Sequence, residues 1–344
     1  MISSPWITYL VTVGSTALAA GCVCAAILWL LLRTGLAWRL ATDVPNQRSL
    51  HERPTPRVGG WGIVPAVVVV MVLTAPRFAV IPLCALALAA MSQVDDRRGL
   101  SARVRFMAHF AAAAVLLATM RPASPWWVLI PLAFALVWLI NLYNFMDGSD
   151  GLAGGMALFG FGGYALAALI GQHPDPALAC ACAAVAGAAA GFLVFNFHPA
   201  RIFLGDAGSI PLGFLAGALG YWGWREGTWP FWFPAMAFSP FIADATVTLL
   251  RRLARGEKFW QAHREHYYQR MVRLGMGHAR TALCWYALMV AGIVLACLAL
   301  GQSFGVQLGL AVVWAIALLT AGVAIDIRWR RSEAFLSSST SREV

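Results

Sequence analysis

The residues of this 344-residue sequence that could do chemistry are carboxylates standing among small and amide side chains. Asp147 and Asp150 are three residues apart, glycines surround them, and Asn144 precedes them. This spacing lets both carboxylates face one point, where their hard oxygen atoms could hold Mg²⁺. Asp206 lies among small residues just before an apolar run and could also reach a metal. The structural alternatives are an ordinary turn at 147–150 and an N-cap at Asp206 or Ser209.

A second pair of carboxylates is formed by Asp95 and Asp96. Adjacent carboxylates repel each other and are costly to remove from water, so a divalent cation or a proton-acceptor role would offset their cost. Simple ion pairs explain them equally well, because four arginines follow closely: Arg97, Arg98, Arg103 and Arg105.

Basic side chains are concentrated in the segment 43–60, whose three prolines predict an ordered loop rather than a helix. Arg48, His51 and Arg57 are its candidates for capturing a phosphate at the membrane surface. The glycine pair at 59–60 could turn backbone N–H groups toward an anion. A juxtamembrane patch for anionic lipid is the alternative.

A further basic segment follows residue 262. At helical spacing, His263, His266, Arg270 and Arg273 share one face, which predicts an amphipathic interfacial helix with a donor-rich stripe. We expect His263 and Arg270 to bind substrate. A surface helix resting on anionic lipid is the alternative.

The elements that must position these residues are apolar. The hydrophobic fraction is 60%, the charged fraction is 12% and the mean hydropathy is +0.71. In soluble proteins the hydrophobic fraction is about 45–50% and the charged fraction is about 25%. These values exclude a disordered chain and a disulfide-stapled domain, and they argue against a soluble enzyme. An all-α polytopic membrane protein remains.

Eleven apolar stretches are long enough to cross a bilayer, and none shows the alternation of a barrel. They are 6–32, 59–75, 77–94, 103–121, 125–143, 152–171, 177–196, 208–224, 229–250, 281–301 and 304–327. We expect one integral membrane catalytic domain over 1–331. The polar, Ser-rich segment 332–344 is predicted to be a disordered tail.

The charges predict how the chain is oriented. Of the 25 Lys and Arg residues, all but Arg77, Arg121 and Arg225 lie on one set of connections. The positive-inside rule makes that side cytoplasmic, with the N-terminus outside and the C-terminus inside. The net charge of +10 therefore needs no nucleic-acid partner. All but two of the 15 Asp and Glu residues lie on the same side, which places the chemistry at the cytoplasmic face.

The motifs occur in an order typical of a known family. They are D-x-P-N-x-R-S-x-H-x-x-P-T-P-R-x-G-G, an Asp-Asp pair, N-F-x-D-G-x-D-G-L-A, N-x-x-P-A-x-I-F-x-G-D-x-G-S and a final His-containing loop. Together they cover about residues 43 to 275. This chain resembles the polyprenyl-phosphate N-acetylhexosamine-1-phosphate transferases.

The resemblance implies an activity and roles for residues. A UDP-N-acetylhexosamine-type donor would pass its sugar-1-phosphate to undecaprenyl phosphate, and UMP would leave, with Mg²⁺ or in its place Mn²⁺ as cofactor. The matched positions are Asp95 and Asp96 for the lipid phosphate or the metal, Asn144, Asp147 and Asp150 around nucleotide and metal, Asp206 as metal ligand, and His266 as the leading His of the last motif. The implied location is the bacterial inner membrane, and a homodimer is left open.

Two departures narrow the branch of the family. Tyr267 and Tyr268 follow His266 where a His-rich triplet is frequent, and Arg97 and Arg98 stand near a position where Lys is frequent. Both argue against the phospho-MurNAc-pentapeptide translocase of peptidoglycan synthesis and favour transferases that initiate O-antigen or surface polysaccharide. That translocase stays an alternative. A transporter, from another class, would instead carry polar groups near the midplane.

Topology reporters test the predicted orientation. Alkaline phosphatase fused after residue 123, 174, 227 or 302 should be active, because these connections are predicted to be periplasmic. Fusions after 53, 148, 203 or 262 should be silent. Activity at 148 or 203 would contradict both the orientation and a shared cytoplasmic site.

Overall fold

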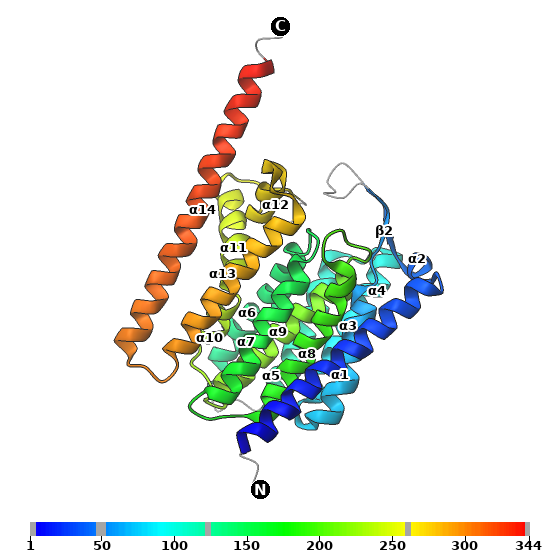
Figure 1. Cartoon of the computed structure of the whole chain (residues 1–344), viewed down its shortest axis with the longest axis vertical. Coiled ribbons are helices and arrows are strands. Elements are labelled where there is room, and N and C mark those ends of the chain that lie inside the picture. Colours follow the sequence, from blue (N-terminus) through cyan, green and yellow to red (C-terminus); the bar gives the residue numbers. More distant parts are fainter. Residues whose placement is uncertain (1–4, 46–52, 121–124, 259–262, 341–344) are drawn as a thin grey trace.

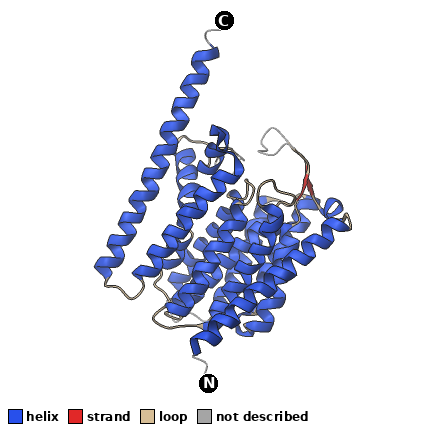
Figure 2. Cartoon of the chain, in the orientation of Figure 1, coloured by secondary structure: helices blue, strands red, loops and turns tan. Residues whose placement is uncertain are grey.

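The computed structural model describes residues 5–45, 53–120, 125–258 and 263–340. Helices make up nearly all of it (Figures 1 and 2). The helices are α1 (Pro5–Arg33), α2 (Leu36–Leu40), α3 (Gly59–Thr74), α4 (Val80–Arg98), α5 (Ala102–Thr119), α6 (Trp126–Phe145), α7 (Leu152–Ile170), α8 (Pro176–Asn196), α9 (Asp206–Arg225), α10 (Phe233–Ala237), α11 (Ser239–Ala254), α12 (Tyr267–Met271), α13 (Gly277–Ala299) and α14 (Phe304–Thr340). A short 3₁₀ turn, Pro76–Phe78, precedes α4, and a π-helical turn, Val272–Met276, follows α12.

The expected all-α membrane fold is confirmed in class. Each of the eleven predicted stretches overlaps a helix of 16 residues or more, and seven helices of the described chain are long and apolar enough to cross a membrane. The stretch 229–250 is divided into α10 and α11, with Pro234 and Pro240 in the first turns of these helices. Proline is accepted in a first turn but not in a continuous helix interior. The count of eleven spans stays a prediction.

Small residues let the central helices approach closely. α7, α8 and α9 are the most deeply buried, and they are rich in Ala and Gly. A Cβ atom added at Gly187 of α8 would lie 2.0 Å from the carbonyl oxygen of Ala17 in α1. In lipid there is no hydrophobic driving force between helices, so close packing at small residues stabilises their association.

The start of α1 and the end of α14 lie at opposite ends of the bundle (Figure 1). The polar segments gather at the C-terminal end, where β1 (Thr42–Asp43) and β2 (Thr55–Pro56) pair antiparallel and where α12 lies. The loops that precede α7 and α9 reach the same end. The bundle therefore brings the chemical motifs together at one of its two ends.

The predicted disordered tail is wrong for most of its length. α14 continues to Thr340, so residues 332–340 are helical, and 341–344 lie outside the described residues. Extending an existing helix adds a hydrogen bond for each residue without a new nucleation cost, and the segment contains no proline or glycine. A polar composition alone was therefore insufficient to predict disorder.

Candidate active site

A polar cavity of about 290 Å³ lies where the loops before α7 and α9 meet. It unites five of the predicted site residues: Arg57, Asn144, Asp147, Asp150 and Asp206. Its other walls are Asp43, Gly148, Ser149, Asn196, Phe203, Gly205 and His278.

Asp206 enters the cavity from the first residue of α9. The capping position belongs to Gly205, which has φ 71° and whose carbonyl accepts the N–H groups of Gly208 and Ser209 at 2.8 and 2.9 Å. The left-handed φ explains a glycine there. Because Gly205 supplies the cap, the alternative of an N-cap at Asp206 is wrong, and its carboxylate is available to the cavity.

Asp147 shares the cavity with Asp206 at an electrostatic cost. Burial raises the pKa of Asp147 well above its usual range, and the negative charge of Asp206 raises it further. The backbone N–H of Gly205 and the Arg57 guanidinium act in the opposite direction. Burial thus disfavours the ionised form of both carboxylates, and a bound cation would favour it.

Asn144 is oriented by α9. The Ser209 hydroxyl, which is fully buried, donates to Asn144 Oδ1 at 2.8 Å. This bond fixes the amide plane and leaves the amide NH₂ to donate toward a substrate oxygen.

Arg57 is held by the small sheet. Its N–H donates to Ala41 at 3.0 Å, Phe203 N–H donates to Pro56 at 2.8 Å, and Arg57 forms a parallel bridge with Phe203. This pairing joins the end of β2 to the strand-like segment before α9. The predicted ordered loop is thus confirmed for its described ends, whereas Arg48 and His51 lie outside the described residues.

The predicted anion-facing glycines have another role. Gly59 and Gly60 donate their N–H groups to the carbonyls of Phe203 and Leu204 at 2.9 and 3.0 Å. A Cβ atom at Gly60 would lie 2.3 Å from the carbonyl carbon of Ala207. The proposal that these N–H groups face an anion is therefore wrong, because the pair serves close packing of α3 against the start of α9.

Asp95 and Asp96 lie beside the cavity and are absent from its described walls. Asp96 Oδ1 is 3.5 Å from Arg57 Nη2, so this carboxylate reaches the site through that arginine. Asp95 accepts the Leu100 N–H at 2.6 Å and lies 3.3 Å from Arg105 Nη1. For Asp95 this geometry matches the alternative of an arginine pair.

Asp150 is bound by groups that sequence reasoning did not select. Its Oδ2 lies 2.7 Å from His198 Nδ1 and accepts the Ala200 N–H at 3.1 Å. His198 stacks on His278 with ring centroids 5.4 Å apart, and Ser149 Oγ lies 2.9 Å from His278 Nδ1. His278 was missed because it is a single polar residue before a long apolar stretch, and its only sequence signal was its place on the predicted cytoplasmic side.

Asn196 ties the carboxylate loop to the segment before α9. Its Oδ1 accepts the Gly151 N–H and its Nδ2 donates to the Ile202 carbonyl, both at 2.9 Å. Gly151 has φ 74° and precedes α7. The buried amide therefore sets the distance between the two loops that carry Asp147 and Asp206.

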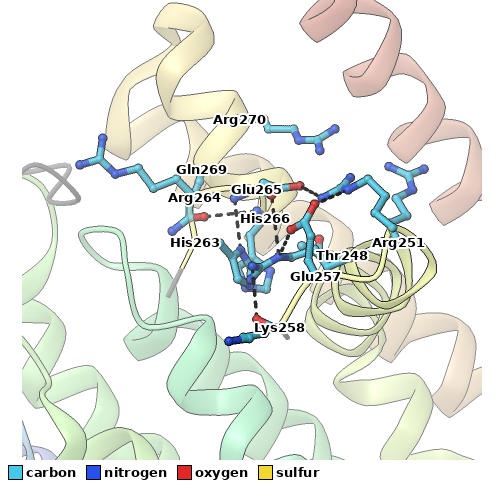
Figure 3. A network of polar contacts seen from close by, with 12 residues as sticks. Thr248, Arg251, Glu257, Lys258, His263, Arg264, Glu265, His266, Gln269 and Arg270 are labelled. Atoms are coloured by element: carbon cyan, nitrogen blue, oxygen red, sulfur yellow. Dashed lines mark hydrogen bonds and ion pairs between the residues drawn. The ribbon is translucent and has the colours of Figure 1, made fainter. Parts of the chain in front are cut away.

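The described residues of the last motif are absent from the walls of the cavity. Figure 3 shows the polar network that surrounds His266. His266 is buried and its Nδ1 lies 3.1 Å from Asp244 Oδ1. The same carboxylate accepts the N–H groups of Tyr267 and Tyr268 at 2.9 and 3.1 Å. The sequence gives no sign of the role of Asp244, because this residue stands inside the apolar stretch 229–250.

The predicted amphipathic helix is shorter than expected. α12 begins at Tyr267 and the chain turns at Gly275, which has φ 87°. His263 and His266 therefore precede the helix, and their rings lie 4.7 Å apart.

Burial lowers the pKa of His263 to about 4, with the His266 and Arg252 charges acting in the same direction. Arg270 donates to Asp326 of α14 at 2.8 Å.

α12 nevertheless contacts the site. Tyr268 Oη donates to the Phe145 carbonyl at 3.3 Å. A Cβ atom added at Gly148 would lie 2.1 Å from Tyr268 Oη. The buried Asp244–His266 pair thus supports a tyrosine that leans on the loop carrying Asp147.

Helices apolar enough to cross a membrane, with carboxylate, amide and guanidinium groups converging at one end, are typical of membrane enzymes that act on phosphate-bearing substrates. Comparison with known proteins narrows this class. The profile described as "Glycosyl transferase family 4" matches residues 78–223. The decaprenyl-phosphate N-acetylglucosaminephosphotransferase of Mycobacterium tuberculosis is 32% identical over 306 residues, covering 73% of this chain and 74% of that protein.

Two further relatives are also transferases of sugar phosphates by name. The probable undecaprenyl-phosphate N-acetylglucosaminyl 1-phosphate transferase of Bacillus subtilis is 28% identical over 287 residues, which cover 76% of this chain and 79% of that protein. The phospho-N-acetylmuramoyl-pentapeptide-transferase of a Synechocystis species is 31% identical over 247 residues, which cover 63% of this chain and 66% of that protein. The chain belongs to glycosyl transferase family 4 and is a phosphoglycosyltransferase, as its motifs indicated.

The contact between α12 and the carboxylate loop can be tested by a rescue. Gly148→Ala should lower transferase turnover about tenfold, because overpacking here costs about 1–3 kcal/mol and displaces the loop. Adding Tyr268→Phe removes the obstructing oxygen, since the next nearest ring atom is 3.2 Å away, and should restore most of the turnover. Turnover is measured on membranes with matched protein levels. A double variant no better than Gly148→Ala would contradict the contact.

Proposed function

We propose that this phosphoglycosyltransferase passes an N-acetylated sugar-1-phosphate from a UDP-sugar to undecaprenyl phosphate and releases UMP. The product would be the first lipid-linked intermediate of a surface polysaccharide. The observation that carries the proposal is the convergence of Asp147, Asp206, Asn144 and Arg57 on one small cavity. The site would work at the cytoplasmic face of a bacterial plasma membrane, where a soluble nucleotide and a lipid phosphate meet.

The donor set suits Mg²⁺, or Mn²⁺ in its place. Within the described ranges, no three His, Cys, Asp or Glu side chains are close enough to form a metal site by themselves. Mg²⁺ in phosphoryl-transfer sites commonly takes one or two carboxylates and completes its shell with water and substrate phosphate oxygens. Asp147 and Asp206 fit that pattern, and the raised pKa of Asp147 identifies a carboxylate that a cation would stabilise. When bound, the ion would neutralise charge on the diphosphate.

The chain's own residues would position the two substrates. Arg57 supplies positive charge beside the carboxylates, and the Asn144 NH₂ can donate to a phosphate or sugar oxygen. An oxygen of the lipid phosphate attacks the sugar-bearing phosphorus, a new P–O bond forms, and the bond to UMP breaks with its electron pair leaving on UMP. Such reactions depend on positioning and charge neutralisation rather than on covalent chemistry by the protein.

Direct attack is favoured over an aspartyl intermediate on Asp95. Both of its oxygens are already engaged, one by the Leu100 N–H and the other by Arg105. Asp96 keeps its link to Arg57 and would act on the lipid phosphate indirectly. We place His266 as a positioning residue, because it is buried against Asp244.

The relatives support the N-acetylglucosamine branch. The matches to N-acetylglucosaminyl and N-acetylglucosaminephosphotransferases cover more of this chain than the match to the pentapeptide transferase. Peptidoglycan synthesis is therefore the second candidate. Radiolabelled UDP-sugars offered to purified membranes, with the lipid product identified, separate the two.

The metal assignment predicts the effect of Asp206→Asn. The substitution keeps the shape, and the helix cap is unaffected because Gly205 provides it. Losing one anionic oxygen should lower turnover about 10²-fold or more, which corresponds to about 2.7 kcal/mol of barrier. The measurement is exchange of labelled UMP into UDP-sugar across an Mg²⁺ titration.

Asp175→Asn is the matched control. Asp175 lies at the opposite end of the bundle, where it caps α8 and pairs with Arg77. Its asparagine variant should keep normal exchange. Near-normal exchange by Asp206→Asn at low Mg²⁺ would contradict the ligand assignment.

A further inference from the structure

A second cavity, larger than the carboxylate cavity, lies apart from it. It has a volume of about 850 Å³ and runs between α11, α13 and α14. Its walls are mainly apolar, for example Val247, Leu288, Leu318 and Val323. No wall residue of this groove also lines the carboxylate cavity.

α12 separates the two cavities. Tyr267 lines the groove, and its ring lies 3.4 Å from the position that a Cβ atom at Gly322 of α14 would take. The next residue, Tyr268, points to the other side and contacts Gly148 of the carboxylate loop. An occupant of the groove would therefore touch the reverse side of the element that supports the site.

A basic cavity of about 480 Å³ adjoins the groove, since Arg251 lines both. The basic cavity has six arginines and three carboxylates in its walls. Asp326 binds Arg251 and Arg270, and Glu265 binds Arg255, as the network of Figure 3 partly shows. Positive charge remains in excess after these pairs.

Part of this positive charge lies on α14, which also contributes Asp326 and Glu333 to the walls of the basic cavity. Arg328 lines the groove, Arg330 lines the basic cavity, and Arg273 lies over the Trp329 ring at 4.6 Å. Apolar walls leading to a cluster of arginines match a molecule with a hydrocarbon tail and an anionic head. A free anion would not need the groove, and a plain hydrocarbon would not need the arginines.

We propose that this groove binds an anionic membrane phospholipid, with its acyl chains between α11, α13 and α14 and its phosphate at Arg328 and Arg330. Basic pockets between membrane helices on the cytoplasmic side suit such headgroups. The acceptor lipid is a weaker candidate, because its phosphate must reach Asp147 and Asp206 on the other side of α12. A bound phospholipid would hold α14, whose apolar length is almost wholly exposed, against α12.

The test is lipid retention by the full chain in native mass spectrometry. The protein is placed in mixed micelles containing phosphatidylglycerol, phosphatidylcholine or undecaprenyl phosphate. We expect phosphatidylglycerol to be retained over phosphatidylcholine. The pair Arg328→Gln and Arg330→Gln should weaken its binding about thirtyfold, because each arginine near a membrane surface contributes about 1 kcal/mol. Ala315→Phe, which fills the groove without changing charge, should also displace it.

The pair Arg33→Gln and Arg39→Gln on α1 and α2 removes the same charge elsewhere and should leave retention unchanged. Equal losses in this control would show surface electrostatics alone and overturn the site. Unchanged retention in Ala315→Phe would overturn the groove. Preferential retention of undecaprenyl phosphate would assign the groove to the acceptor and contradict the phospholipid.

Discussion

The electrostatic cost of placing Asp147 and Asp206 together at the end of an apolar bundle constrains the rest of this structure. Burial raises the pKa of both carboxyl groups, and the negative charge of Asp206 raises that of Asp147 further. The compensating groups come from elements far apart in sequence. Arg57 arrives through the two-stranded sheet, and the Gly205 N–H arrives from the turn before α9.

Close helix packing makes this convergence possible. Gly60 lets α3 contact the start of α9, Asn196 links the loops before α7 and α9, and Tyr268 supports Gly148 from α12. Asp244 in turn fixes α12 through two backbone N–H groups and His266. The site is therefore positioned by buried polar groups, of which Asn196 lines the cavity and Asp244 and His266 lie outside its described walls. The candidate catalytic groups lie at helix ends and in the loops between them.

The sequence predicted the helical membrane fold and five walls of the cavity, because long apolar runs and clustered Asp, Asn and Gly are local signals. It did not predict His278, His198 or Asp244 as partners, since each is a single polar residue whose role depends on packing between distant segments. The glycines at 59 and 60 were misassigned for the same reason. The helical tail beyond 332 shows that continuation of a helix can outweigh a polar composition.

Electron paramagnetic resonance of Mn²⁺ bound to the purified chain with a UDP-sugar tests the central claim most directly. If Asp147 and Asp206 hold one cation against the donor diphosphate, the spectrum should show a single protein-bound Mn²⁺ coupled to ³¹P. This signal should disappear in both Asp147→Asn and Asp206→Asn. A ³¹P-coupled, protein-bound Mn²⁺ that persists when both carboxylates are replaced would contradict the account.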